Sequence, residues 1–350
     1  MRPCVLPTDG WTRQSCESRR MMICIKNFSK DTNAKNAKNM DKLLCVVGTT
    51  GSGKSALALE LARKFRGEIL AADSRVVYRG MDIGTAKILG QRIRTGEYAD
   101  AVVADNVYHW LQDLVEPDEP FTVADWKRAA LLVISKIIGR GHLPIMVGGT
   151  GLYIKALVDN LEPPAVPPLP ELRRSLENRP LTELVAMLFN IDPEAQKTVD
   201  LRNPRRVIRA IEVARGIAPK VADRKKSVGP LFDTLQLAIG LPRAELYRRI
   251  DERVEEQVAA GLFEEVERLF KKYGPDLPAL SAIGYREIVG GWTSAGRSNL
   301  LSRAAIIQRI KYDTHAYARR QLTWFRRDKR IRWIKNTEEA EATIEAWLGK

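Results

Sequence analysis

The chain has 350 residues, 45% of them hydrophobic and 29% charged, which is enough apolar material for one large or two ordinary domains. A predominantly disordered protein is therefore excluded. A transmembrane protein is excluded as well, because Lys136 interrupts the longest apolar run, at residues 131–138, before it reaches the roughly 18 to 20 residues of a span.

The net charge of +14 is unevenly distributed along the chain. Residues 202–226 hold nine basic and two acidic residues, and residues 297–335 hold twelve and two. Such basic segments on an otherwise acidic body indicate a polyanionic partner, with nucleic acid as the first candidate.

The cysteines stand at positions 4, 16, 24 and 45 without a CxxC pair, so we expect no zinc site and no disulfide framework. Free thiols are typical of a reducing compartment, and we expect a cytoplasmic protein. Residues 1–40 lack apolar periodicity, which predicts a disordered extension or a start upstream of the true one at Met40. A transit peptide is the alternative, against which Asp9, Glu17 and Asp31 argue.

From residue 42 short apolar runs alternate with helical patterns, which predicts an α/β fold with a parallel sheet flanked by helices. The strands that we expect are residues 43–47, 68–72, 144–147 and 235–239. Long helices are expected at residues 244–270, where apolar residues recur every four positions, and at residues 300–327.

The middle of the chain predicts a small helical domain inserted into the sheet domain. Five prolines within residues 162–170 exclude a helix or a central strand and indicate a hinge. A helical block follows to about residue 215, and a polar stretch at residues 220–229 leads back to the sheet. The expected segments are an extension (1–40), a catalytic core (41–162 and 232–335), an inserted helical domain (163–231) and a C-terminal tail (336–350).

A phosphate-binding loop of the pattern GxxxxGK[ST] lies between the first strand and the next helix. Its backbone N–H groups face an anion at the start of the helix, the lysine adds a positive charge, and the last hydroxyl can hold Mg²⁺. The loop consists of Gly48, Thr49, Thr50, Gly51, Ser52, Gly53, Lys54 and Ser55. It predicts binding of a di- or triphosphate without specifying the group transferred.

Two polar residues follow other strands of the predicted sheet. Asp73 ends the second strand, and Thr150 follows the glycine pair Gly148–Gly149 after the third. Ligands of open parallel sheets bind beyond the carboxyl ends of the strands, so Asp73 should face the phosphates. It is suited to be a general base or a Mg²⁺ ligand, and a third interpretation is a helix cap.

Several arginines are candidates for anion contacts. Arg249 and Arg253 share one face of a helix and could clamp a diphosphate or be solvated partners of neighbouring acids. Residues 315–327 interleave aromatics with arginines, where Trp324 and Phe325 either pack in the core or stack on bases. A second basic face is expected at Arg202, Arg205, Arg206 and Arg209. The alternative for Arg205 and Arg209 is internal pairing with Glu194 or Glu212.

The motifs GTTGSGKS, ADSRVVYRGMDIGTAK, GGTGLYIKAL, NPRRVIRAIEV, RRIDERV, AIGYREI and ARRQLTWFR, in this order, resemble those of the bacterial tRNA dimethylallyltransferases of the IPP transferase family. The resemblance covers residues 42–335. It implies transfer of a dimethylallyl group from dimethylallyl diphosphate to N6 of the adenosine 3′ of the anticodon. The departures are Thr49 in place of Pro, Val76 in place of Gln and His315 in place of Arg.

The resemblance further implies roles for particular residues. Asp73 would be the catalytic base, supported by Lys54 and Thr150, and the loop would bind diphosphate with Mg²⁺ at Ser55. The anticodon stem-loop of tRNA would be contacted by the inserted domain and the core, through Asp73, Ser74, Arg75, Val76, Thr150, Arg173, Arg205, Arg206, Arg209, Ser281, Ala282, Ile283, Gly284, Tyr285 and Arg286. We expect a monomer.

Two other function classes are compatible with a phosphate loop. A small-molecule P-loop kinase, or a prenyltransferase acting on free adenine nucleotides, would have no use for two extended basic faces. A nucleic-acid-binding module with a vestigial loop would not need the intact pair Lys54 and Ser55.

Overall fold

The computed structural model describes residues 40–95, 99–162, 166, 169–216, 229–274, 277–293 and 302–349. The chain divides into two compact units, one formed by the residues up to Asp159 and from Pro230 onward, the other by Asn160–Gly229. The predicted extension at residues 1–40 lies outside the described residues except for Met40, as does most of the polar stretch at residues 220–229.

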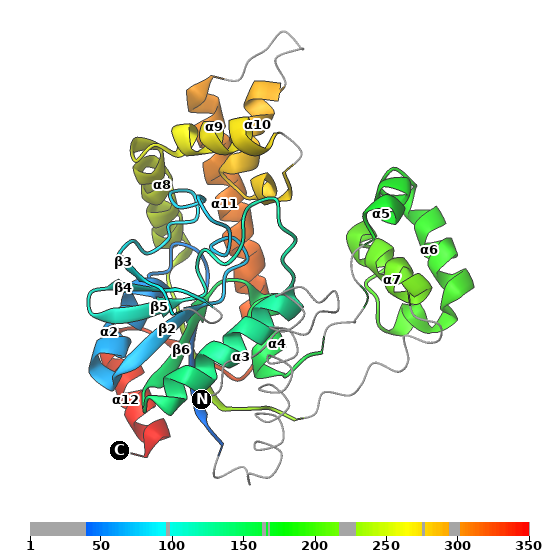
Figure 1. The fold of residues 1–350 in the computed structure, drawn as a ribbon. Coiled ribbons are helices and arrows are strands. Elements are labelled where there is room, and N and C mark those ends of the chain that lie inside the picture. Colours follow the sequence, from blue (N-terminus) through cyan, green and yellow to red (C-terminus); the bar gives the residue numbers. More distant parts are fainter. Residues whose placement is uncertain are drawn as a thin grey trace, which may run out of the picture. The chain divides into compact units, whose positions relative to one another are not determined.

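The larger unit is built on one mixed sheet with the strand order β3-β4-β5-β2-β6-β1-β7-β8 (Figure 1). The strands from β5 to β8 in this order are parallel, and β3, β4 and β5 are joined by antiparallel pairing. The strands are β1 (Lys42–Val47), β2 (Gly67–Ala71), β3 (Gln91–Ile93), β4 (Ala101–Ala104), β5 (Val107–Trp110), β6 (Leu143–Gly148), β7 (Asp233–Ile239) and β8 (Ile331–Ile334).

The predicted α/β class is confirmed, and the four expected strands are neighbours at the centre of the sheet, as β2, β6, β1 and β7. β1 and β6 are fully buried over nearly their whole length, which explains why they read as continuous apolar runs. The short strands β3, β4, β5 and β8 were not expected, because three or four residues give too little alternation to detect.

Helices cover both faces of this sheet. One face packs against α2 and α12 through a core that includes Leu44, Val46, Leu61 and Ile344. The other face packs against α3, α4 and the block α8–α11. These helices are α2 (Lys54–Phe65), α3 (Val123–Gly139), α4 (Gly151–Val158), α8 (Arg243–Ala259), α9 (Leu262–Tyr273), η4 (Pro278–Ser281), α10 (Tyr285–Thr293), α11 (Arg303–Arg326) and α12 (Thr337–Leu348).

The expected C-terminal tail at residues 336–350 is wrong, because Thr337–Leu348 forms the helix α12. Asn336 caps it by accepting a hydrogen bond from the backbone N–H of Glu339. Ala340 and Ile344 are buried against the sheet, and the Trp347 indole donates to Asp233. The segment is therefore part of the core.

The single helix expected at residues 244–270 is also wrong, because the chain breaks between α8 and α9 at Gly261. Its φ of 102° lies in the left-handed region, which costs a glycine little and ends α8. The helix expected at residues 300–327 is confirmed from Arg303 to Arg326, with Ser302 as its N-cap.

The inserted unit contains α5 (Pro170–Glu177), α6 (Leu181–Ile191), η2 (Pro193–Lys197) and α7 (Pro204–Gly216). It has its own core of Leu176, Leu184, Leu188, Val207 and Ile211 with their neighbours. The unit therefore has the separate hydrophobic core that a domain needs in order to fold on its own. Across the described residues of both units, no helix is long and apolar enough to cross a membrane.

Candidate active site

The phosphate loop connects β1 to α2 and has the conformation that its glycines allow. Gly51 and Gly53 have φ values of 76° and 87°, which side chains other than glycine adopt only with strain. A Cβ at Gly51 would also come within 2.8 Å of Ile250, so α8 packs directly on the loop. The Ser52 hydroxyl is buried and has no partner within the described part of the chain. Such an orphaned donor fits a loop shaped to receive an anion.

Two cations and one carboxylate converge at this loop. The Lys54 ammonium donates to the Thr49 carbonyl at 3.1 Å. Burial first and the charge of Arg253 second lower the pKa of Lys54, the charge of Asp73 opposes both, and the resulting pKa is about 8. Burial likewise lowers the pKa of Arg253, and Asp73 again opposes the shift. Asp73 is therefore within electrostatic range of both cations, although it follows a different strand.

Asp73 and Thr150 are linked into one structural unit at the ends of β2 and β6. The Thr150 hydroxyl accepts a hydrogen bond from the Ser74 backbone N–H at 3.1 Å, and the Thr150 N–H donates to the Ala72 carbonyl at 3.2 Å. Asp73 Oδ1 accepts from the Arg75 N–H at 2.8 Å. Because a turn and not a helix follows Asp73, the helix-cap interpretation is wrong.

Two residues of α11 that sequence reasoning did not assign to the site lie next to this unit. Gln321 hydrogen-bonds to Thr50 and Gly149. Burial and the charge of Asp73 raise the pKa of Tyr317 to about 12, although hydrogen bonding to Thr150 and Gln321 acts in the opposite direction. The phenol is therefore a protonated neighbour of Asp73 at neutral pH. The only available signal was the spacing of four, which places both side chains on one helix face.

The two arginines of α8 have different surroundings. Arg249 forms an ion pair with Glu245, with 2.6 Å between Nε and Oε1, as the solvated-partner interpretation predicts. Its Nη1 also lies near Gly53, 3.5 Å from where a Cβ would stand. Arg253 is close enough to Lys54 and Asp73 to interact electrostatically with both, and burial lowers its pKa. A diphosphate clamp formed by both guanidiniums would thus combine Arg249 at the edge of the site with the more deeply buried Arg253.

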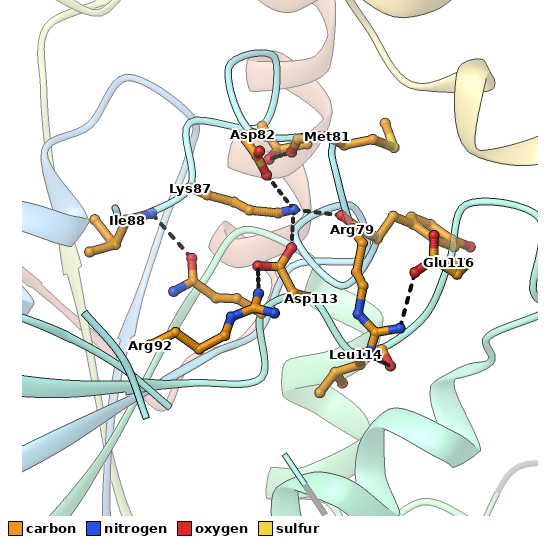
Figure 2. Close-up of polar contacts among 12 residues, drawn as sticks. Arg79, Met81, Asp82, Lys87, Ile88, Arg92, Asp113, Leu114 and Glu116 are labelled. Carbon is orange, nitrogen blue, oxygen red and sulfur yellow. Dashed lines mark hydrogen bonds and ion pairs between the residues drawn. The ribbon is translucent and has the colours of Figure 1, made fainter. Parts of the chain in front are cut away.

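The motif MDIGTAK, which follows Asp73 in the sequence, is held together by a buried cation (Figure 2). The ammonium of Lys87, whose side chain is 2% exposed, donates to the carboxylates of Asp82 and Asp113 and to the Tyr78 carbonyl. Arg92 also pairs with Asp113. An unpaired ammonium would be costly at this depth, so the loop is fixed around it.

The same segment is fixed from its other side by Glu265 of α9. The buried carboxylate of Glu265 accepts hydrogen bonds from the backbone N–H groups of Asp82, Ile83 and Gly84, at 2.8 to 3.1 Å, and from the Tyr285 hydroxyl. The motif MDIGTAK therefore supports the chain that carries Asp73, with Lys87 buried and Asp82 partly exposed.

The residues expected to contact tRNA differ in how much of their side chains is exposed. The side chains of Val76, Ala282 and Tyr285 are buried, which leaves their backbone as the available contact. The Arg75 guanidinium donates to the Ser281 hydroxyl at 3.2 Å and joins two of the expected segments. Ile283 and Gly284 lie in the same turn, where the Gly284 N–H donates to Glu287. The Arg286 guanidinium is paired with Glu287 and Asp313.

In the inserted unit, internal ion pairs engage most of the expected arginines. Arg173 and Arg209 both bind the carboxylate of Glu212, which is fully buried. Arg206 pairs with Asp200. The Arg205 side chain is exposed, and among the described residues it has no ion pair within 4.0 Å.

The two aromatic residues of α11 have opposite environments. Phe325 is buried in the main core, as the packing interpretation predicts. Trp324 is 39% exposed, and its indole lies so close to Gly151 that a Cβ there would overlap it. Trp324 therefore presents a free ring face beside the first turn of α4.

Comparison with known proteins gives one consistent result. Residues 76–328 match the family model described as IPP transferase. The tRNA dimethylallyltransferase of Thermomicrobium roseum is 44% identical over 85% of this chain and 87% of its own length, and that of Moorella thermoacetica is 41% identical over 89% and 96%. The solved full-length tRNA isopentenylpyrophosphate transferase of Bacillus halodurans superposes with a TM-score of 0.61 at 32% identity, covering 88% of this chain and 96% of that one. A eukaryotic dimethylallyltransferase solved while acting on tRNA gives 0.64 at 26%, covering 81% and 69%.

Proposed function

We propose, since the chain belongs to the IPP transferase family, that it transfers a dimethylallyl group from dimethylallyl diphosphate to N6 of the adenosine 3′ of the tRNA anticodon, releasing diphosphate. The observation that carries this proposal is the placement of Asp73 within electrostatic range of Lys54 and Arg253. A carboxylate opposite two cations suits a reaction that removes a proton on one side and stabilises an anionic leaving group on the other.

The leaving group accumulates negative charge as the bond to the allylic carbon breaks. The free backbone N–H groups at the start of α2 and the Lys54 ammonium would bind the diphosphate. Arg253 adds a second partly buried charge, and Arg249 a third at the rim. Glu245 pairs with Arg249, but Asp73 offsets the charges of Lys54 and Arg253 only in part, and the remaining positive charge supports a diphosphate as the natural ligand.

The acceptor amine is a weak nucleophile, because its lone pair is delocalised into the adenine ring. Asp73 is suited to accept its proton during or after attack, and Thr150 is suited to hold the turn that positions Asp73. Tyr317 adds a phenol that remains protonated near neutral pH and so can donate but not compete as a base.

A magnesium ion fits the donor set of the loop. Ser55 is exposed at the first turn of α2, and the described residues contain no cluster of three His, Cys, Asp or Glu side chains that would bind a cation without phosphate oxygens. Ser55 would hold the ion together with diphosphate oxygens and water. When bound, the ion would neutralise charge on the departing diphosphate.

The RNA partner is the anticodon stem-loop, for which the two basic segments supply the charge. An unpaired loop lowers the cost of moving the target base out of its stack. We propose that the protein acts as a monomer, because its described helices cover both hydrophobic cores of the sheet domain. We place it in the cytoplasm, because the cysteine pattern is typical of a reducing compartment.

The decisive experiment incubates the protein with dimethylallyl diphosphate, Mg²⁺ and an unmodified anticodon stem-loop, and measures the mass of the RNA. We expect the mass of one dimethylallyl group, located on the adenosine 3′ of the anticodon. A parallel reaction supplies adenosine monophosphate as the acceptor, and another supplies ATP as a phosphoryl donor. Modified mononucleotide with untouched RNA, or phosphoryl transfer at a matching rate, would contradict the proposal.

A further inference from the structure

Gln321 of α11 joins the phosphate loop to the turn that follows β6. Its Oε1 accepts a hydrogen bond from the Thr50 N–H at 2.9 Å, and its Nε2 donates to the Gly149 carbonyl, also at 2.9 Å. The side chain is buried. A primary amide is needed here, because one end must accept and the other must donate.

The two segments that Gln321 joins belong to different halves of the proposed reaction. The loop at residues 48–55 holds the leaving group. The turn at Gly149 continues into Thr150, which is hydrogen-bonded to the backbone on both sides of Asp73. Among the described residues, Gln321 is the one side chain that hydrogen-bonds to both segments.

The sequence around this contact is shaped to admit the Gln321 amide. A Cβ at Gly149 would overlap Nε2, so only glycine lets the side chain reach the backbone. One helical turn earlier, Tyr317 approaches Thr150 and Gln321. Gly149 therefore serves the close approach of α11.

We propose that Gln321 is a positioning residue of the transfer reaction, which fixes the spacing between the diphosphate loop and the Asp73–Thr150 pair. This inference rests on the proposed function. Displacement at carbon requires the base, the acceptor and the leaving group to be aligned, and a shift of about 1 Å can cost roughly 10²-fold in rate. Gln321 also engages the Thr50 N–H, so this amide is not available to the diphosphate.

The test compares Gln321→Met, which keeps the volume and removes both hydrogen bonds, with Gln308→Met, the same change at an exposed position of α11. We expect kcat for Gln321→Met to fall by about 10- to 10²-fold, while the dissociation constant of the stem-loop stays within about twofold of that of Gln308→Met. Weakened RNA binding with an unchanged kcat would overturn the proposal, because it would reduce Gln321 to a support for the RNA surface.

A second pair of variants tests the contact from its other end. Gly149→Ala pushes the Gln321 amide away, whereas Gly139→Ala places a Cβ where nothing lies within 4 Å. We expect Gly149→Ala to reproduce the loss of kcat, and the double variant with Gln321→Met to lose little more, because both changes break the same contact. Fully additive losses would contradict the shared role. If Gln321→Met fails to fold, the comparison of single and double variants is made with Gln321→Glu, which retains the hydrogen-bond acceptor for Thr50.

The binding of inorganic diphosphate tests this inference separately from the proposed function. Its affinity for the protein, measured by calorimetry, does not depend on which acceptor is used. We expect Gln321→Met to weaken diphosphate binding several-fold relative to Gln308→Met, because the loop loses its anchor at Thr50. A wild-type protein that modifies no RNA would defeat the proposed function, and an unchanged diphosphate affinity would defeat the role of Gln321.

Discussion

Lys54 of the phosphate loop and Arg253 of α8 lie close enough for their like charges to interact. Burial lowers the pKa of Lys54 to about 8, with the Arg253 charge as the next cause, and the carboxylate of Asp73 compensates only in part. The two cations therefore repel each other within the site. A diphosphate bound beside them, as we propose, would offset this repulsion and raise the pKa of Lys54.

The pH dependence of substrate capture follows from this relationship. In the proposed reaction the protonated form of Lys54 binds the diphosphate group. kcat/KM for dimethylallyl diphosphate should therefore not change with pH below about 7, where Lys54 is protonated, and should fall as the pH rises through about 8. The fall should approach tenfold per pH unit. Because the ligand stabilises the ammonium, the corresponding loss in kcat should occur at higher pH.

Arg253→Gln provides the control for this assignment. Removing the guanidinium removes a cause that lowers the pKa of Lys54, so the alkaline limb should move to higher pH even though overall affinity drops. A limb that stays in place in Arg253→Gln would assign the titration to another group.

Asp73→Asn keeps the shape of the side chain and its hydrogen bond from Arg75, but removes the base. We expect kcat to fall by about 10²- to 10⁴-fold, with stem-loop affinity little changed. Asp118→Asn, at an exposed position, is the matched control. Steady-state turnover and a filter-binding measurement on the same preparations check both expectations, and near-normal turnover of Asp73→Asn would end the general-base role.

The central sheet and the phosphate loop could be predicted from the sequence, because both depend on local patterns. Four buried strands read as apolar runs, and the loop motif contains its own glycines, lysine and serine. The residues around Asp73 could not be predicted in the same way. Tyr317 and Gln321 reach the site from α11, and only the tertiary packing of this helix brings them there.

The sequence also does not show which charged residues pair with each other in the folded protein. The sequence shows that Arg173, Arg209 and Glu212 are charged, but not that Glu212 is buried and binds both arginines. Arg209 and Glu212 are three positions apart, a helical spacing that allows their pairing to be expected as an alternative to an RNA contact. The pairing of Arg173 with Glu212 across 39 positions has no periodic signal and could not be anticipated.

The buried ammonium of Lys87 should contribute strongly to stability. Lys87→Met leaves the carboxylates of Asp82 and Asp113 facing each other without their shared cation, and Asp113 is largely buried. We expect the free energy of unfolding to fall by roughly 3 kcal/mol, since removing one partner of a buried ion pair exposes the full cost of the other. Lys271→Met, which removes an exposed ion pair of α9, should change it by less than about 1 kcal/mol. Denaturant titration of both variants makes the comparison, and equal losses would refute the assignment.

The last prediction separates Arg205 from Arg209 in the inserted unit. Arg205 is exposed and lacks an ion pair among the described residues, whereas Arg209 binds Glu212 and the Val166 carbonyl. If Arg205 contacts a phosphate of the stem-loop, Arg205→Ala should reduce the slope of log K against log[salt] by about 0.7 and leave the melting temperature unchanged.

Arg209→Ala should behave differently, because its guanidinium helps to neutralise a fully buried carboxylate. Burial raises the pKa of Glu212, but its hydrogen bonds with Arg173, the Leu169 N–H and Arg209 together hold the pKa below its usual value. Removing Arg209 weakens this compensation, so the inserted unit should melt at a lower temperature, and stability should be lost at a higher pH on acidification than in the wild type. The sign follows from the lowered pKa, since stability gained above the unfolded pKa of a carboxyl is lost as the pH falls through its folded value. Salt titrations and thermal melts of the two single variants therefore distinguish a contact with RNA from a support of the fold. An Arg209→Ala variant with wild-type stability and a reduced salt slope would show that Arg209 binds phosphate directly, despite its internal partner.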